Sequence, residues 1–251
     1  WVNIPDIIQS AEDIQIQRGV GYSSMGGSGL GGSISIKTTK KYLRPFFNYS
    51  LHAGSFNTIR NSIQASTGIL PNGWQLTARG SHIYSDGWVD RASSRLTSFF
   101  VDISKYGDKY TSHLIATHGR EKTYQSWYGL SEADYRAGLL TKNTAGTDYE
   151  QKLGDPYPNQ TDNYGQSHLQ WIHNFYWNPK FNSSLTGFLS HGRGYYEEYK
   201  VGRDYNTYSS SLMGNGDLIR QLWLDNLLLG VNSSHIYENK HISNVLAISF
   251  S

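Results

Sequence analysis

The feature that most constrains the fold is a two-residue alternation of apolar and polar side chains, repeated along most of the chain. From Phe47 to Ala53 every second residue is apolar, and the residues between them are polar. Successive side chains of a β-strand point to opposite faces, so this period predicts strands with one apolar and one polar face. The nine predicted strands cover residues 47–54, 62–69, 74–81, 98–103, 109–119, 165–177, 181–194, 222–237 and 241–251.

The connections between these segments differ in length in a regular way. Tight turns rich in Gly, Pro, Asn and Asp, flanked by aromatic residues, occupy 70–74, 106–110, 177–181 and 237–241. Long polar stretches occupy 84–95, 120–164 and 195–221. Strands of about ten residues with short turns at one end, long loops at the other and an aromatic girdle are typical of a transmembrane antiparallel β-barrel of the outer membrane.

A closed barrel suits a membrane because lipid offers no hydrogen-bond partners, and the barrel pairs every backbone donor and acceptor between its strands. Alternating strands with turns between them also describe a soluble β-sandwich or a propeller, which bury their apolar faces inside the protein. The strands of a sandwich are usually shorter, however, and nothing requires its long and short loops to alternate. The sequence therefore favours an all-β transmembrane barrel.

Composition excludes several other classes. The chain has 19 Tyr, 9 Phe and 7 Trp but only 6 Pro and 17% charged residues, which is not the composition of a disordered chain. Its net charge of +2 comes without a basic block longer than Lys40-Lys41, which argues against a nucleic-acid partner. It has no cysteine, and no apolar run reaches the roughly 18 residues of a membrane-spanning helix. The chain begins at Trp1 without a signal peptide, and we expect both ends to be cut from a longer protein.

The first 41 residues are organised differently from the rest. Two short alternating runs, 13–18 and 33–38, enclose a glycine-rich stretch, which predicts a strand, a tight glycine loop and a returning strand. Residues 27–32 also satisfy the dinucleotide-binding pattern G-x-G-x-x-G. That site needs a helix directly after the last glycine, and strand-like residues follow here, which argues against a nucleotide site.

The segment Ala11–Thr38 resembles the end of the plug domain of TonB-dependent outer-membrane receptors, from the strand leading into Arg18-Gly19 to Gly31-Gly32 and the returning strand. Four later segments are similar to barrel and loop segments of such receptors from the Bacteroidetes, namely 119–127, 159–164, 194–200 and 217–225. The resemblance implies that residues 1–41 are the C-terminal part of a plug domain. Residues 42–251 would be the first part of a barrel of about 22 strands, so the chain would be a fragment.

The resemblance also implies a function. Receptors of this family import a scarce ligand across the bacterial outer membrane, energised by the TonB–ExbB–ExbD complex, and they are not enzymes and need no cofactor. We expect the ligand to be a small-molecule metal chelate, an iron complex of a siderophore or of haem. Cobalamin and oligosaccharides are the alternatives, the latter with a surface lipoprotein as a partner. A passive outer-membrane channel and a soluble β-rich binding module remain as alternatives from other classes.

Candidate site residues follow from the resemblance and from the loops. Arg18, Gly19, Gly31 and Gly32 are expected to hold the plug against the barrel, with Arg18 buried beside an acidic partner because an unpaired buried charge is costly. The long loops combine aromatic rings with guanidinium groups, which suit a ligand that carries carboxylate, catecholate or phosphate oxygens. The expected ligand-binding residues are Met25 at the tip of the plug loop, Trp88, Arg91, Tyr124, Trp127, Tyr128, Tyr195 and Tyr196.

Other kinds of site find no support in the sequence. The nine His residues show no ligand spacing such as H-E-x-x-H, so no metal site is expected. No G-x-S-x-G nucleophile motif and no spaced catalytic triad stands out, so no catalytic residue is expected.

Overall fold

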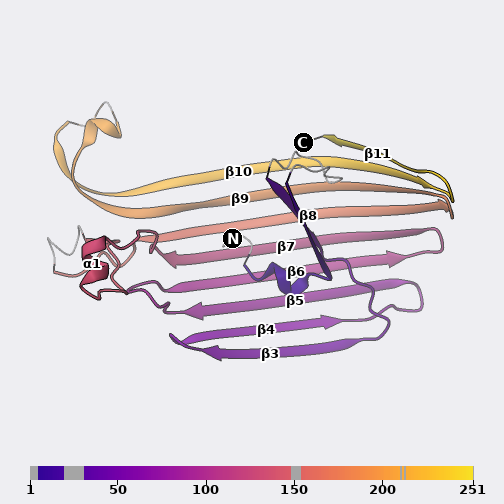
Figure 1. Ribbon diagram of the computed structural model, residues 1–251, viewed down its shortest axis with the longest axis horizontal. Helices are drawn as coiled ribbons and strands as arrows, with labels where there is room; N and C mark the ends of the chain where they lie inside the picture. The colour runs from indigo at the N-terminus through magenta and orange to yellow at the C-terminus, as the bar shows by residue number, and fades with distance from the viewer. Residues whose placement is uncertain (1–4, 20–30, 148–153, 210, 212, 251) are drawn as a thin grey trace.

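The computed structural model describes residues 5–19, 31–147, 154–209, 211 and 213–250. These residues form two antiparallel sheets, one of two strands and one of nine (Figure 1). In the large sheet each strand pairs with the next one along the chain, so the topology is a meander. The predicted all-β class and the predicted nine strands after residue 42 are confirmed. None of the helices in the described ranges is long and apolar enough to cross a membrane.

The bounds of the elements are as follows. The small sheet contains β1 (Asp13–Arg18) and β2 (Gly32–Lys37). The large sheet contains β3 (Phe46–Gly54), β4 (Thr58–Ser66), β5 (Trp74–Ser85), β6 (Ser94–Tyr106), β7 (Tyr110–Tyr124), β8 (Thr161–Asn178), β9 (Phe181–Asp204), β10 (Asn215–Glu238) and β11 (Ser243–Phe250). The helical turns are η1 (Ile7–Ser10), α1 (Glu132–Arg136) and η2 (Tyr205–Thr207).

The two faces of the large sheet differ in what covers them. Residues directly opposite each other on neighbouring strands share a face. One face carries the side chains that contact the N-terminal segment, and we call it the inner face and the other the outer face. Along β5, Gln75 and Thr77 are buried on the inner face, whereas Trp74 and Leu76 are exposed on the outer face. The polar half of the predicted alternation is therefore the inner face, and the apolar half is the outer face.

The two ends of the large sheet also differ. Tight turns join the strands at one end, and the longer connections with α1 lie at the other, which we call the loop end (Figure 1). The turn between β4 and β5 requires glycine at position 73. Its φ is 78°, and a Cβ atom there would collide with the carbonyl oxygen of Tyr106.

The strands at the loop end are longer than the alternation predicts. β9 and β10 have 24 residues each and extend into segments predicted to be loops. The apolar–polar alternation ends there because both faces become polar, whereas the backbone pairing continues. Tyr195 and Tyr196, predicted to lie in a loop, are therefore part of β9. The connection of β3 to β4 is also short, with positive φ at Phe56 and Asn57, so loop lengths do not alternate strictly.

Candidate functional site

The N-terminal segment is fastened to the inner face by a buried ion-pair cluster. Arg79 Nη1 lies 3.1 Å from Asp6 Oδ2, and Arg60 Nη2 lies 3.0 Å from Asp6 Oδ1. Arg79 also donates to Ser10 Oγ at 2.7 Å and to Ser98 Oγ at 3.2 Å. The side chain of Arg79 is only 2% exposed. The guanidinium group thus ties η1 to two neighbouring strands, β5 and β6.

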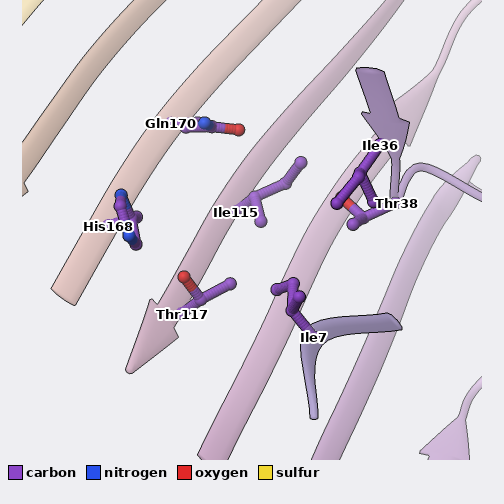
Figure 2. Close-up of a pocket in the computed structure, with 7 residues that line it drawn as sticks. All are labelled: Ile7, Ile36, Thr38, Ile115, Thr117, His168 and Gln170. Atoms are coloured by element: carbon purple, nitrogen blue, oxygen red, sulfur yellow. The ribbon is translucent and has the colours of Figure 1, made fainter. Parts of the chain in front are cut away.

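A small cavity lies between the N-terminal segment and the sheet (Figure 2). Its lining consists of Ile7, Ile36 and Thr38 from the N-terminal segment and Ile115, Thr117, His168 and Gln170 from β7 and β8. Its volume of about 170 Å³ is below the roughly 300–1,000 Å³ of small-molecule sites. We therefore assign it to imperfect packing between the segment and the sheet.

The residues expected to hold a plug behave differently from one another. Arg18 is exposed at the end of β1, as is every other residue of that strand. Its expected burial between a plug and a barrel wall stays a prediction, and the arginine that the structure buries is Arg79. Gly19 and Gly32 have positive φ, which favours glycine at both positions, and Gly31 accepts a hydrogen bond from the backbone of Gly19. Met25 lies outside the described residues.

A larger cleft lies at the loop end and has a volume of about 420 Å³, within the range of small-molecule sites. It is lined by Glu121, Asp162, Tyr164, Gly194, Tyr195, Tyr196, Leu222, Trp223 and Leu224. Tyr196 belongs to the inner face because it pairs with Asp162 and Leu222. The ring of Trp127 meets the ring of Tyr196 edge-on, with centroids 5.6 Å apart. Two of the expected ligand-binding residues, Tyr195 and Tyr196, therefore line this cleft, and Trp127 contacts one of them.

Glu121 is the most unusual group in the cleft. It is 1% exposed, and neither carboxylate oxygen has a hydrogen-bond partner within the described part of the chain. Burial, together with the charge of Asp162, raises the pKa of Glu121 from 4.5 to about 7. Its sequence neighbours Arg120 and Lys122 are exposed on the outer face, so Glu121 lies beyond the apolar part of the sheet. The cleft thus contains a buried carboxyl group that can take up or release a proton near neutral pH.

Two further carboxylates near the cleft are well paired. Glu197 accepts hydrogen bonds of 2.6 Å from Tyr157, Gln221 and Asn159. Burial alone would raise the pKa of Glu197, but these hydrogen bonds outweigh burial and lower it. Glu198 is held by Arg220 and by Lys200, whose Nζ lies 3.2 Å away. These contacts stiffen the loop end.

Sequence reasoning missed all of these acidic residues because it looked only for aromatic and cationic loop residues. A signal was nevertheless present for Glu121. The strand period places Arg120 and Lys122 on one face of β7 and Glu121 on the other, the face that carries the buried polar residues.

Other expected ligand-binding residues have structural contacts. The guanidinium group of Arg91 donates to the carbonyl oxygens of Asn143 and Ala145 and lies over the ring of Tyr124, 5.9 Å from its centroid. The hydroxyl of Tyr124 donates to the carbonyl oxygen of Tyr157 at 2.7 Å. These two residues order the connection from β7 to β8. Two other expected residues, Trp88 and Tyr128, are exposed and do not line the cleft. Tyr195 lines the cleft and packs on Trp223, with ring centroids 4.6 Å apart.

A serine, a histidine and an aspartate also meet on the inner face, but not as a catalytic triad. His113 Nδ1 lies 3.1 Å from Ser104 Oγ and 3.1 Å from Asp102 Oδ2. A triad uses one ring nitrogen for the serine and the other for the acid, and here a single nitrogen contacts both.

The chain was compared with protein-family models, curated proteins and solved structures. No protein-family model and no curated protein matches the chain. Among solved structures, it is similar to the ferric-catecholate import receptor Fiu from E. coli K12 in its open form (TM-score 0.65, 12% identity, covering 95% of this chain and 38% of Fiu). It is also similar to the pyoverdine outer membrane receptor FpvA from Pseudomonas aeruginosa PAO1 bound to pyoverdine (TM-score 0.65, 9% identity, covering 99% and 35%). A third is the siderophore receptor PiuA from Acinetobacter baumannii (TM-score 0.65, 12% identity, covering 92% and 33%).

The chain thus spans about a third of the length of these solved receptors. At these identities the likeness shows the fold alone. The nine-stranded sheet has the fold of part of a TonB-dependent receptor barrel.

Proposed function

We propose that this chain is part of a TonB-dependent receptor in the bacterial outer membrane that imports an iron complex of a siderophore or of haem. Residues 1–41 are then the end of the plug, and residues 42–251 are the first nine barrel strands. The inner face lines the lumen, the outer face meets lipid, and the loop end faces the outside of the cell. The chain works with TonB–ExbB–ExbD as its energy source.

The observation that carries this proposal is the anchoring of the N-terminal segment on the polar face of the sheet. The Asp6–Arg79 contact joins residues 73 positions apart in the sequence. A segment on the inner face is what a plugged barrel requires, whereas a passive channel needs an open lumen. The exposed apolar residues of the outer face, such as Leu76, Phe99 and Leu114, suit lipid and argue against a soluble binding module.

The choice of an iron complex rests on the similar solved receptors and on the lining of the cleft. The solved receptors that the chain resembles are described as receptors for ferric catecholate, for pyoverdine and for siderophores. The loop-end cleft, with aromatic rings on its walls, suits a ligand with flat ring systems. Cobalamin and oligosaccharides, the latter with a surface lipoprotein, are the alternatives, and an origin in the Bacteroidetes stays a prediction.

A growth experiment tests the proposal. A strain deleted for the full-length gene is grown with haem, a panel of ferric siderophores or cobalamin as the only limiting source, beside a complemented control. We expect growth to fail on one iron source and to return with the gene. Normal growth on every iron source would contradict the iron assignment and favour glycans or peptides.

Two tyrosines at opposite ends of the sheet allow a matched test of the cleft, because Tyr196 lines it and Tyr237 lies at the tight-turn end of β10. We expect Tyr196→Ala to weaken ligand binding about 30-fold, or about 2 kcal/mol, because it removes an aromatic ring from the cleft wall. Tyr237→Ala, which removes an exposed ring far from the cleft, should change affinity by less than about twofold. The measurement is a binding titration of the full-length receptor with the chelate found in the growth experiment. Equal losses in both variants would contradict a ligand site on the inner face.

A further inference from the structure

The outer face changes its chemistry sharply along β7 and β9. On β7 the outward residues Leu114 and Ala116 are followed, toward the loop end, by His118, Arg120 and Lys122. All five are exposed. The apolar part of the outer face of β7 therefore ends in a band of basic residues, two of which, Arg120 and Lys122, carry a positive charge.

The same change occurs on β9, where outward Leu189 is followed by His191 and Arg193. The strand register aligns the two sets. Arg120 pairs with Gly165 of β8, and Gly165 pairs with Arg193, so a glycine separates the two arginines in one row across the sheet. Neighbouring strands lie about 4.8 Å apart, which places the two arginine Cα atoms about 10 Å apart.

This row forms the floor and walls of a groove of about 450 Å³. The lining includes His118, Arg120, Gly165, His191, Arg193 and Trp223. Because glycine has no side chain, the space between the two arginines stays open. We call this groove the basic groove.

The charges in the basic groove are only partly compensated. Asp225 lies 3.0 Å from His191 Nε2 and 3.6 Å from Arg193 Nε. Arg193 remains 63% exposed, and its guanidinium carbon lies 5.3 Å from the centroid of the Trp223 ring. Arg120 has no ion pair with any residue in the described ranges. The residues that line the groove thus include two arginines and no carboxylate, and Asp225 beside it pairs with only one of these arginines, so the groove is complementary to an anion.

We propose that the basic groove binds the phosphate of an anionic lipid headgroup in the outer leaflet, with Arg120 and Arg193 as its ligands. The proposal rests on the proposed function, which places the outer face in lipid. The groove opens sideways from the sheet, directly beyond the apolar band, and this is the level at which lipid phosphates lie. Guanidinium groups bind phosphate through two parallel hydrogen bonds, and the apolar band beside them would contact the acyl chains.

The test uses the full-length receptor in detergent and native mass spectrometry, titrated with diphosphorylated lipid A, with the same lipid lacking its phosphates, or with inorganic phosphate. Arg120→Gln/Arg193→Gln should bind diphosphorylated lipid A about 100-fold more weakly than the wild type, since each lost charged hydrogen bond weakens binding about tenfold or more. The matched control, Lys105→Gln/Lys109→Gln, removes two positive charges at the other end of the sheet and should bind normally. The wild type should bind the dephosphorylated lipid as weakly as the arginine variant binds the intact one.

A second variant tests the shape of the groove without changing its charge. A Cβ atom at Gly165 would lie 3.7 Å from its nearest neighbours, an ordinary contact, so Gly165→Leu should fold and fill the space between the arginines. We expect it to lose lipid binding to a similar extent. Unchanged binding by either the arginine variant or Gly165→Leu would overturn the proposal, as would saturation by inorganic phosphate at the same concentrations as the lipid.

Failure of the proposed function gives a different pattern. Ligand uptake should be the same in the wild type and in the groove variants, because Arg120, Gly165 and Arg193 line the groove but not the cleft and belong to the face opposite Glu121 and Tyr196. A wild-type protein that does not fractionate with the outer membrane would overturn both proposals. A wild-type protein that reaches the outer membrane and imports its ligand, but binds all lipids equally, would overturn only the lipid site.

Discussion

Replacement of Arg79 by methionine is expected to weaken the attachment of the N-terminal segment to the sheet by about 3–5 kcal/mol, the usual loss when one partner of a buried ion pair is removed. The Asp6 side chain is only 9% exposed and, within the described ranges, would keep only Arg60 as an ion-pair partner. Ser10 and Ser98 would lose their donor to a thioether side chain that cannot replace it. Methionine has a similar stem, so the loss comes from charge and hydrogen bonds rather than from a cavity.

The measurement is the rate of limited proteolysis of the N-terminal segment in the full-length receptor, together with urea unfolding in detergent. The control is Arg95→Met, an exposed arginine on the outer face of β6 whose guanidinium carbon lies 5.6 Å from the centroid of the Tyr84 ring. That variant should change stability by no more than about 0.5 kcal/mol. Equal proteolysis rates for both variants would show that the cluster does not hold the segment.

The comparison of Arg18 with Arg79 shows what a sequence can and cannot predict. The alternation in β5 assigned Arg79 to the polar face together with Gln75, Thr77 and Ser81, and the structure confirms that assignment. The alternation could not reveal that Asp6 is the ion-pair partner of Arg79, because this contact depends on how the N-terminal segment lies on the sheet. Family resemblance pointed instead to Arg18, which the structure leaves exposed.

The candidate site was predicted less well than the strands for a related reason. Strand prediction used the contrast between an apolar and a polar face, and this contrast disappears beyond the apolar band. The loop-end parts of β7, β9 and β10 therefore looked like loops, and their side chains could not be assigned to a face. Tyr195 and Tyr196 were both expected to contact the ligand from a loop, whereas in β9 their side chains point to opposite faces of the strand, although both residues line the cleft.

The stability of the loop end is expected to fall as the pH rises from about 5 to about 8, because of Glu121. Its pKa is about 7 in the folded protein and near 4.5 in the unfolded chain. Below pH 4.5 the Glu121 carboxyl is largely neutral in both the folded and the unfolded state, so it does not lower the free energy of unfolding. Between these pH values the folded state binds more protons than the unfolded state, so stability declines with pH. At about 1.4 kcal/mol per pH unit, the loss approaches roughly 3 kcal/mol at pH 8.

Glu121→Gln should abolish most of this decline, because an amide does not ionise in this range. The change is measured as the urea midpoint of the full-length receptor at pH 5, 6, 7 and 8. Glu132→Gln is the matched control: Glu132 is an exposed residue at the start of α1 whose removal should leave the pH dependence as it is. A decline of equal size in the Glu121 variant would mean that another group carries it, with Asp162 as the first candidate, because burial also raises the pKa of that carboxyl. If the decline disappears, the Glu121 carboxyl group in the cleft is largely protonated below pH 7. Ligand affinity should then depend on pH between about 5 and 8.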